Sequence, residues 1–388
     1  YTPICLAFGI LHQDNRFELY TDRRKIPGWI AKKLPDQIEV YDLDTFFHGL
    51  DRLGKSSAIV RIDPSSAADA ICLRLKNSGA NVQHEEDPCL LPKACKNKAE
   101  LNGIRAAHIR DGLALTRFLS WLSREGTSGK VSELSAAERL EALRREGKNF
   151  QALSFPTISG TGPNGAIVHY RVTEKSNRPL DQNSLYLVDS GGQYLDGTTD
   201  VTRTIAIGTP SDEMKERFTC VLKGHIALAT AIFPSGTSGS QLDVLARTAL
   251  WRVGLDYDHG TGHGVGHYLG VHEGPHRISK APDRVALRPG MIISNEPGYY
   301  EEGAYGIRIE NLLVVNHAEH QPSVNREMLC FETLTLAPID LNLVVIELLS
   351  CAEINWLNRY HEKVFRAHRA KLNKEDQNWL QSNTAPIS

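Results

Sequence analysis

The sequence predicts an α+β fold in which antiparallel strands alternate with pairs of helices. A strand pair is expected from Ser184 to Ile207, where an apolar run and a β-branched run flank Asp196-Gly197, a dipeptide typical of hairpin turns. Amphipathic helical patterns stand in pairs on both sides of this stretch, and each ends at a glycine or proline. They cover residues 96–125, 135–147, 212–233 and 242–253. Such an order favours helices that cover one face of a sheet with antiparallel strands.

Length and composition are those of a soluble globular protein with two domains, or with one large domain and appendages. The chain has 388 residues, of which 41% are hydrophobic and 23% are charged. Its net charge of -2 gives no reason to expect nucleic acid or an anionic membrane as a partner. No apolar segment approaches the length that spans a bilayer and no signal peptide is evident, so we expect a cytoplasmic protein. The seven cysteines are scattered and odd in number, which is typical of reduced thiols.

The chain is expected to divide into four parts. Residues 1–88 show the pattern of a small α/β unit without a chemical motif, and because the chain starts at Tyr1 in an apparent strand, this N-terminal domain is expected to be partial. Its strands are expected at 4–11, 16–20, 58–62 and 81–84, with a helix at 63–77. Residues 89–95 are predicted to be a linker, 96–338 the main domain and 339–388 a C-terminal extension.

The expected hairpin carries two acidic residues in unusual positions. Asp189 directly follows an apolar strand, and Asp200 lies 11 positions later. Residues that face each other across a two-residue hairpin are separated by an odd number, so both carboxylates can share one face of the sheet. Because such carboxylates repel each other and are costly to desolvate, a divalent cation between them is expected. The alternative is a solvated hairpin with turn aspartates, which suits Asp196 better than Asp189.

Histidines are concentrated between His259 and His276, where five fall within 18 residues. The first three have the spacing of a zinc-binding helix, but four intervening glycines disfavour a helix. We therefore predict extended backbone from which histidines project toward a ligand. Upstream, His169 is predicted to end a short strand after a Gly/Pro-rich loop, from where it could reach a site on the same sheet.

Two glutamates complete the set of acidic residues in apolar surroundings. A predicted strand ends at Glu296, and Glu310 is embedded in a predicted strand over residues 305–315. Arg308 shares the face of Glu310, so it could orient or neutralise that carboxylate without binding a metal. A purely structural ion pair is the alternative.

Four carboxylates and one glycine-flanked histidine, His263, form a ligand set rich in oxygen with a single nitrogen. Such a set suits two divalent ions such as Mn²⁺, Co²⁺ or Zn²⁺ better than one structural zinc ion. Two metals about 3.5–4 Å apart would bridge a water molecule, lower its pKa and polarise a carbonyl group. The residues therefore predict metal-assisted hydrolysis.

The order of these residues resembles the pita-bread metallopeptidase family, which includes methionine aminopeptidase, prolidase and aminopeptidase P. The similarity is greatest to the long, eukaryote-like aminopeptidase P type and covers about residues 96–388. The motifs that carry it are Phe155-Pro-Thr-Ile-Ser, Gly162-Pro-Asn-Gly-Ala, Asp189-Ser-Gly, Asp196-Gly-Thr-Thr-Asp-Val-Thr-Arg-Thr204, His259-Gly-Thr-Gly-His-Gly-Val-Gly266, Val271-His-Glu-Gly-Pro275, Glu296-Pro-Gly-Tyr-Tyr300 and Gly306-Ile-Arg-Ile-Glu-Asn311. The resemblance implies a pita-bread catalytic domain, preceded by a partial creatinase-N-like α/β domain and followed by a C-terminal extension.

The resemblance also implies a metal role for five residues. Asp189 and Asp200 would hold one metal ion. Asp200 and Glu310 would bridge to the second ion. His263 and Glu296 would complete the ligand set of that second ion. Glu296 would in addition carry a proton from the bridging water to the leaving nitrogen.

Three histidines are implied to bind substrate and to steady the tetrahedral intermediate, and His272 is among the catalytic residues by the same resemblance. They are His169, His259 and His272. His267 and His276 match no assigned position, and His267 is expected to be neutral for activity.

The implied reaction is hydrolysis of the bond between an N-terminal residue and a following proline by two divalent ions, with Mn²⁺ the first expectation. Proline has no N–H and a fixed φ, so a pocket shaped for it must replace the hydrogen bonds that general peptidases use. The implied partners are peptides with proline in second position and, through the C-terminal extension, a second copy of the chain. Two alternatives stay open, a prolidase-like dipeptidase and a non-catalytic pita-bread binding module.

Overall fold

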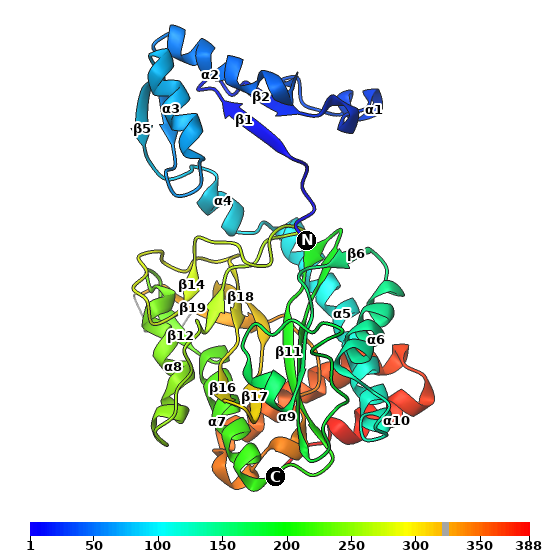
Figure 1. The fold of residues 1–388 in the computed structure, drawn as a ribbon. Coiled ribbons are helices and arrows are strands. Elements are labelled where there is room, and N and C mark those ends of the chain that lie inside the picture. The colour runs from blue at the N-terminus through cyan, green and yellow to red at the C-terminus, as the bar shows by residue number, and fades with distance from the viewer. Residues whose placement is uncertain (320–325) are drawn as a thin grey trace. The chain divides into compact units, whose positions relative to one another are not determined.

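In the computed structural model, which describes residues 1–319 and 326–388, the chain divides into two units (Figure 1). The N-terminal unit is Pro3–Leu91, and the main unit is Pro92–Ser388 together with Tyr1–Thr2. The segment expected to be a linker contains the short helix α4 (Leu90–Ala94). No helix in the described part of the chain has the length and apolar character needed to cross a bilayer.

The N-terminal unit contains two small sheets with two helices packed together. In the first sheet β1 pairs antiparallel with β2, which pairs parallel with β3, and in the second β4 and β5 are parallel. The elements are β1 (Ala7–Leu11), β2 (Phe17–Thr21), α1 (Gly28–Ala31), β3 (Ile38–Asp42), α2 (Phe46–Lys55), β4 (Ile59–Ile62), α3 (Asp69–Ser78) and β5 (Asn81–His84). The sequence did not predict β3 or α2. It also placed the start of α3 too early, because Asp63 accepts from the Ser65 amide and closes a turn before the helix.

The main unit begins with a helix pair that covers the first antiparallel sheet. The long helix α5 (Lys98–Glu125) starts at a capping box formed by Asn97 and Glu100. The helix α6 (Glu133–Arg145) is capped by Ser132, so the predicted start at Ser135 is wrong by two residues. Apolar side chains of both helices share a core with the sheet formed by β11 (Val201–Ile207), β8 (Ser184–Ser190) and β7 (Ile158–Thr161).

The hairpin forms as predicted in outline but with a different turn. Its strands are β8 (Ser184–Ser190), β9 (Gly192–Tyr194), β10 (Gly197–Thr198) and β11 (Val201–Ile207), and β7 (Ile158–Thr161) pairs with β8 from the other side. The turn falls on Leu195 and Asp196, one residue earlier than predicted, and Asp189 pairs with Thr202. A one-residue change of turn shifts the pairing by two, so the odd separation of Asp189 from Asp200 still places both on one face.

A second helix pair and a second antiparallel sheet repeat this arrangement (Figure 1). The helices are α7 (Asp212–Ala229) and α8 (Gly239–Trp251), and the sheet order is β12-β19-β18-β15. The strands of this half are β12 (Ile232–Pro234), β13 (Gly262–His263), β14 (Arg277–Ile278), β15 (Ile292–Asn295), β16 (Gly298–Glu301), β17 (Tyr305–Arg308), β18 (Asn311–His317) and β19 (Met328–Thr333). The predicted strand 305–315 is therefore two strands, with Glu310 in the bend between them. The helix α7 ends four residues early because β12 leaves to pair with β19.

The C-terminal region contributes to the main core. It consists chiefly of α9 (Cys351–His368) and α10 (Lys374–Asn383). Leu357, Tyr360 and Val364 of α9 are buried in one cluster with Phe218 of α7 and Ile307 of β17. The α+β architecture expected from the sequence is thus confirmed, with both helix pairs against antiparallel sheets.

Candidate active site

A cavity of about 460 Å³ in the main unit brings the predicted site residues together. It is lined by Asp189 and Asp200 of the hairpin, by the His-rich segment and by the bend before β18. The nine predicted residues that line it are His169, Asp189, Asp200, His259, His263, His272, Glu296, Arg308 and Glu310. Its volume falls in the range of about 300–1,000 Å³ that is typical of small-ligand sites.

One wall of this cavity has the geometry of a metal site. Ligand atoms of Asp200, His263 and Glu310 all lie within 4.8 Å of one another. The Nε2 atom of His263 is 3.5 Å from Asp200 Oδ2 and 3.3 Å from Glu296 Oε1. The other ring nitrogen, Nδ1, donates to the carbonyl of Gly264 (3.1 Å), which leaves the Nε2 lone pair free for a ligand.

The electrostatics of these carboxylates also suit a cation. Asp200 and Glu310 are 3% and 1% exposed, and burial followed by repulsion from the other acids raises the pKa of both carboxyls well above the usual range. Burial also raises the pKa of Glu296, against the attraction of His263. Asp189 Oδ1 and Asp200 Oδ1 are buried with no hydrogen-bond partner among the described residues. Because a buried carboxylate oxygen without a partner is costly, these residues fit a divalent metal pair.

Arg308 binds a different carboxylate from the one expected. Its Nη2 donates to Asp189 Oδ2 (2.7 Å) and its Nε donates to Thr202 Oγ1 (3.1 Å). Thr202 in turn donates to Glu310 Oε2 (2.8 Å), so Arg308 reaches Glu310 only through this hydroxyl. The predicted pairing with Glu310 is wrong because the chain bends between β17 and β18, and strict alternation of faces does not continue through the bend.

Tyr300 joins Arg308 to His259, a link that the sequence reasoning missed. Arg308 Nη1 donates to the Tyr300 hydroxyl (2.6 Å), which lies 2.8 Å from His259 Nε2. His259 Nδ1 donates to the Gly260 carbonyl (2.8 Å), so Nε2 accepts the proton of Tyr300. Burial, with Arg308 nearby, lowers the pKa of His259 to about 3, and the ring is therefore neutral. The pair Tyr299-Tyr300, which begins three positions after Glu296, is the sequence feature from which a role for Tyr300 could have been predicted.

The remaining histidines divide into two groups. His272 lies edge to face with His263, with 4.2 Å between ring centroids. His169 lines the cavity from a turn after the short 3₁₀ segment Gly162–Ala166, so the strand predicted to end there is wrong. His276 is buried and donates from Nε2 to the Ile292 carbonyl (2.7 Å), away from the cavity lining. His267 does not line the cavity either. As predicted, no helix forms between His259 and His276.

A buried arginine, Arg247 of α8, holds the loop that carries His259 and His263. It is 0% exposed and donates to both carboxylate oxygens of Asp243, at 2.6 and 3.2 Å. The same guanidinium donates to the carbonyl oxygens of Tyr257 (2.6 Å) and His259 (2.9 Å). The backbone of this loop is thus held by the single buried side chain of Arg247.

Arg144 plays a similar part beneath Asp189. This 0% exposed arginine of α6 donates to Asp111 Oδ1 of α5 (2.8 Å) and to the Ser190 hydroxyl. Asp111 also accepts from the Tyr194 hydroxyl (2.9 Å). The end of β8 is therefore tied to the helix pair by a buried ion pair.

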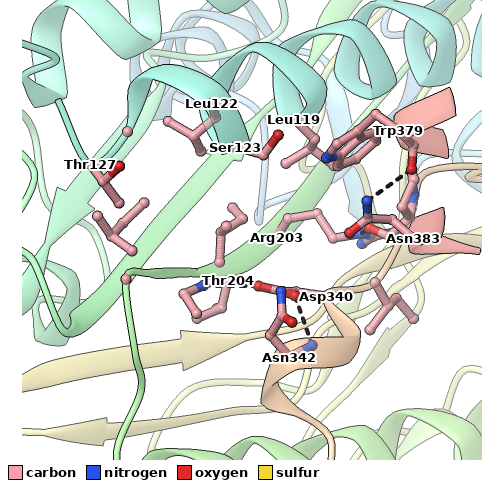
Figure 2. Close-up of a pocket in the computed structure, with 17 residues that line it drawn as sticks. Leu119, Leu122, Ser123, Thr127, Arg203, Thr204, Asp340, Asn342, Trp379 and Asn383 are labelled. Atoms are coloured by element: carbon pink, nitrogen blue, oxygen red, sulfur yellow. Dashed lines mark hydrogen bonds between the residues drawn. The ribbon is translucent and has the colours of Figure 1, made fainter. Parts of the chain in front are cut away.

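A second cavity, of about 280 Å³, lies between α5, β11 and α10 (Figure 2). There the main-chain N–H of Asn342 donates to the Asp340 carboxylate (3.0 Å), and the side-chain amide of Asn383 donates to the Trp379 carbonyl (2.8 Å). Arg203 lines this cavity, but its nitrogens are used by main-chain carbonyls, including Glu310 O (2.7 Å), and by the Tyr360 hydroxyl (2.9 Å). None of the nine predicted site residues lines this cavity, which leaves the larger one as the candidate active site.

Three family models match the chain. Residues 102–317 match metallopeptidase family M24, residues 327–387 match the C-terminal region of peptidase M24, and residues 1–100 match the creatinase/prolidase N-terminal domain. Together they account for the α/β unit, the catalytic fold and the C-terminal region seen in the structure.

Individual relatives point to one branch of this family. Aminopeptidase P1 of Lotus japonicus is 39% identical, and a probable Xaa-Pro aminopeptidase P of Aspergillus oryzae is 42% identical. Each match covers 100% of this chain, but only 68% and 61% of the respective relative. The X-prolyl aminopeptidase of Caenorhabditis elegans, described as a cytosolic enzyme with a di-nuclear active site, superposes with a TM-score of 0.93 at 36% identity and is covered to 64%. Prolidase from Pyrococcus furiosus shares the fold, with a TM-score of 0.64 at 22% identity. The chain therefore belongs to metallopeptidase family M24 and, within it, to the aminopeptidase P branch.

Proposed function

We propose that the chain hydrolyses the peptide bond between an N-terminal residue and a following proline, with two divalent metal ions held by five side chains. These are Asp189, Asp200, His263, Glu296 and Glu310. The observation that carries the proposal is the convergence of these groups on one cavity, where two carboxylate oxygens lack partners. A dinuclear site is described for the C. elegans relative, and the names of the other relatives specify Xaa-Pro cleavage.

The bound metal pair would supply a nucleophilic water at neutral pH and would polarise the scissile carbonyl. Mn²⁺ is our proposed ion, since carboxylates suit it and one imidazole is compatible with it, while Co²⁺ and Zn²⁺ are alternatives.

The chain's own residues orient the site and handle the proton. Ser294 accepts from the main-chain N–H of His263 (2.9 Å) and donates to Glu296 Oε1 (3.0 Å), which ties the Glu296 carboxylate to the backbone that carries His263. Glu296 is proposed to pass the proton to the leaving proline nitrogen. Arg308 holds Asp189 and is not itself a ligand.

Three histidines on the cavity wall are proposed to bind the substrate. His169 and His272 are exposed toward the cavity, while His259 is neutral because of its burial and accepts a hydrogen bond from Tyr300. An imidazole N–H of His169 or His272 can donate to the carbonyl oxygen as it gains negative charge in the tetrahedral intermediate, whereas both nitrogens of His259 are already used by Tyr300 and by the Gly260 carbonyl.

The wider organisation of the protein follows from the same family. We propose the divisions 1–88, 89–95, 96–338 and 339–388, supported by the separation of the units near Leu91. We also propose a homodimer in which the C-terminal region takes part, and a cytoplasmic location like that of the C. elegans relative. A monomer in sedimentation at micromolar concentration would contradict the dimer.

A peptide panel tests the reaction and separates the alternatives. With Mn²⁺ or Co²⁺ added, the chain should release the first residue from Xaa-Pro-Xaa peptides and leave matched Xaa-Ala-Xaa peptides intact, because the site is proposed to select proline. Product release is measured by chromatography. Cleavage confined to Xaa-Pro dipeptides would instead favour a prolidase-like dipeptidase. Absence of both hydrolysis and metal uptake would favour a non-catalytic binding module.

A further inference from the structure

The candidate cavity contains a second guanidinium that the proposed reaction does not use. Arg171 lines the cavity beside His169 and is exposed. Among the described residues it has no hydrogen bond and no ion pair. Arg308, by contrast, is 2% exposed and fully engaged with Asp189, Tyr300 and Thr202. One cation of this cavity is therefore free to meet a substrate.

The segment that carries Arg171 is held in place by a buried carboxylate. Glu133, at the start of α6, is 0% exposed and accepts hydrogen bonds from residues on both sides of Arg171 in the sequence. The donors are Thr161 N (2.8 Å), Asn164 Nδ2 (3.0 Å), Tyr170 Oη (3.0 Å) and Arg178 N (3.2 Å). These hydrogen bonds to Glu133 thus hold the segment in place as one wall of the cavity.

The two neighbours of Arg171 anchor the backbone on either side of it. Tyr170 and Val172 both pack in a small apolar cluster with Ile158 of β7 and Leu187 of β8. Arg171, between them, does not belong to this cluster but lines the cavity and is exposed.

A free guanidinium matches the fork geometry of a carboxylate and binds it with two parallel hydrogen bonds. The four carboxylates of the metal site do not provide this partner, since Arg171 pairs with none of them. A cavity of about 460 Å³ has room for a short peptide, and Arg171 lines the same cavity as the proposed metal ligands.

We propose that Arg171 recognises a carboxylate on the residue that follows the scissile proline, and so gives the site a preference for short or acidic peptides. The carboxylate is either the C-terminus of a tripeptide or an acidic side chain at the third position. This inference rests on the proposed function, since it names the class of peptide that the same site prefers.

The test compares four peptides that differ in this one charge. They are Ala-Pro-Gly as free acid and as amide, and the amides of Ala-Pro-Asp and Ala-Pro-Asn. Arg171→Gln is expected to lower kcat/KM for the charged peptides by about tenfold, chiefly through KM, and to leave the uncharged ones within about twofold. Arg171→Lys should restore part of the difference because it keeps the charge.

Arg178→Gln is the matched control, since Arg178 belongs to the same segment but pairs with Asp181 (2.9 Å) and does not line the cavity. A loss confined to the free acid identifies the tripeptide C-terminus, and a loss confined to the Asp peptide identifies the acidic side chain. An equal loss on all four peptides, or none, would overturn the inference while leaving the proposed function intact. If the unsubstituted chain cleaves none of the four, the proposed function fails, and this inference with it.

Discussion

Glu310→Ala and Asp200→Ala are each expected to abolish Xaa-Pro hydrolysis, with a fall in kcat of about a thousandfold or more. Each substitution removes a proposed bridging ligand, and a metal site contributes several kcal/mol of transition-state stabilisation. Both carboxylates belong to the cluster with His263 at the cavity wall. The measurement is turnover of an Xaa-Pro-Xaa peptide in saturating Mn²⁺, together with the metal content of each variant.

Two matched variants serve as controls for this loss. Asp196→Ala removes a carboxylate of the same hairpin that pairs with Arg110 at the turn and does not line the cavity. His267→Ala removes a histidine from the same segment as His263, again outside the cavity. Both variants should keep activity within about twofold, because neither touches substrate or metal in the proposed site. Near-normal turnover of Glu310→Ala would contradict the bridging assignment.

Asp111→Ala is expected to cause the largest loss of stability, about 3–5 kcal/mol in the free energy of unfolding. The substitution leaves the guanidinium of Arg144 buried without its charged partner. Urea unfolding followed by circular dichroism measures the loss. The matched control is Glu146→Ala, which breaks an ion pair with Arg117 in which both side chains are partly exposed and should cost less than about 1 kcal/mol.

The pH dependence of stability provides a second readout of the same pair. Burial acts to raise the pKa of Asp111, but Arg144 outweighs it, so the pKa lies below its usual range. A carboxyl whose pKa is lowered by folding contributes stability above its unfolded pKa of about 3.9 and loses it as pH falls through the folded value. The unsubstituted chain should therefore lose stability below about pH 4, and Asp111→Ala should lose less over that range. Equal acid sensitivity of both proteins would contradict the role given to this pair.

The part of the site that follows from local periodicity could be predicted from the sequence. In any two-residue hairpin, residues separated by an odd number lie on the same face of the sheet. Asp189 and Asp200 therefore share a face even though the turn was predicted one residue too late. Glycines at alternate positions after His259 likewise excluded a helix, and the structure has none there.

Predictions failed where the chain leaves regular structure. Arg308 and Glu310 were assigned to one face of a continuous strand, but the bend before β18 sends the arginine to Asp189. His169 was assigned to a strand end, whereas its segment is a turn held by Glu133 from α6. Alternation of faces carries no information across such bends.

The supporting contacts could not be found from the sequence because their partners lie far apart in it. Arg144 contacts Asp111 and Ser190 only when the helices and sheets are packed together. The same is true of the contacts that Arg203 makes with Glu310 and Tyr360. A local sequence pattern does not indicate the carboxylate or carbonyl with which a given buried arginine will pair. These side chains nevertheless fix the backbone at both ends of the proposed ligand set.

In the proposed mechanism, five side chains of this chain hold two metal ions that the reaction requires. The most direct measurement is a titration of the metal-free chain with Mn²⁺, in which bound metal and Xaa-Pro-Xaa hydrolysis are followed together. We expect two ions to bind per chain, with full activity only when both are bound, and we expect Glu310→Ala to lose that stoichiometry. Full hydrolysis by the metal-free chain, or the same two-ion binding by Glu310→Ala, would contradict this mechanism.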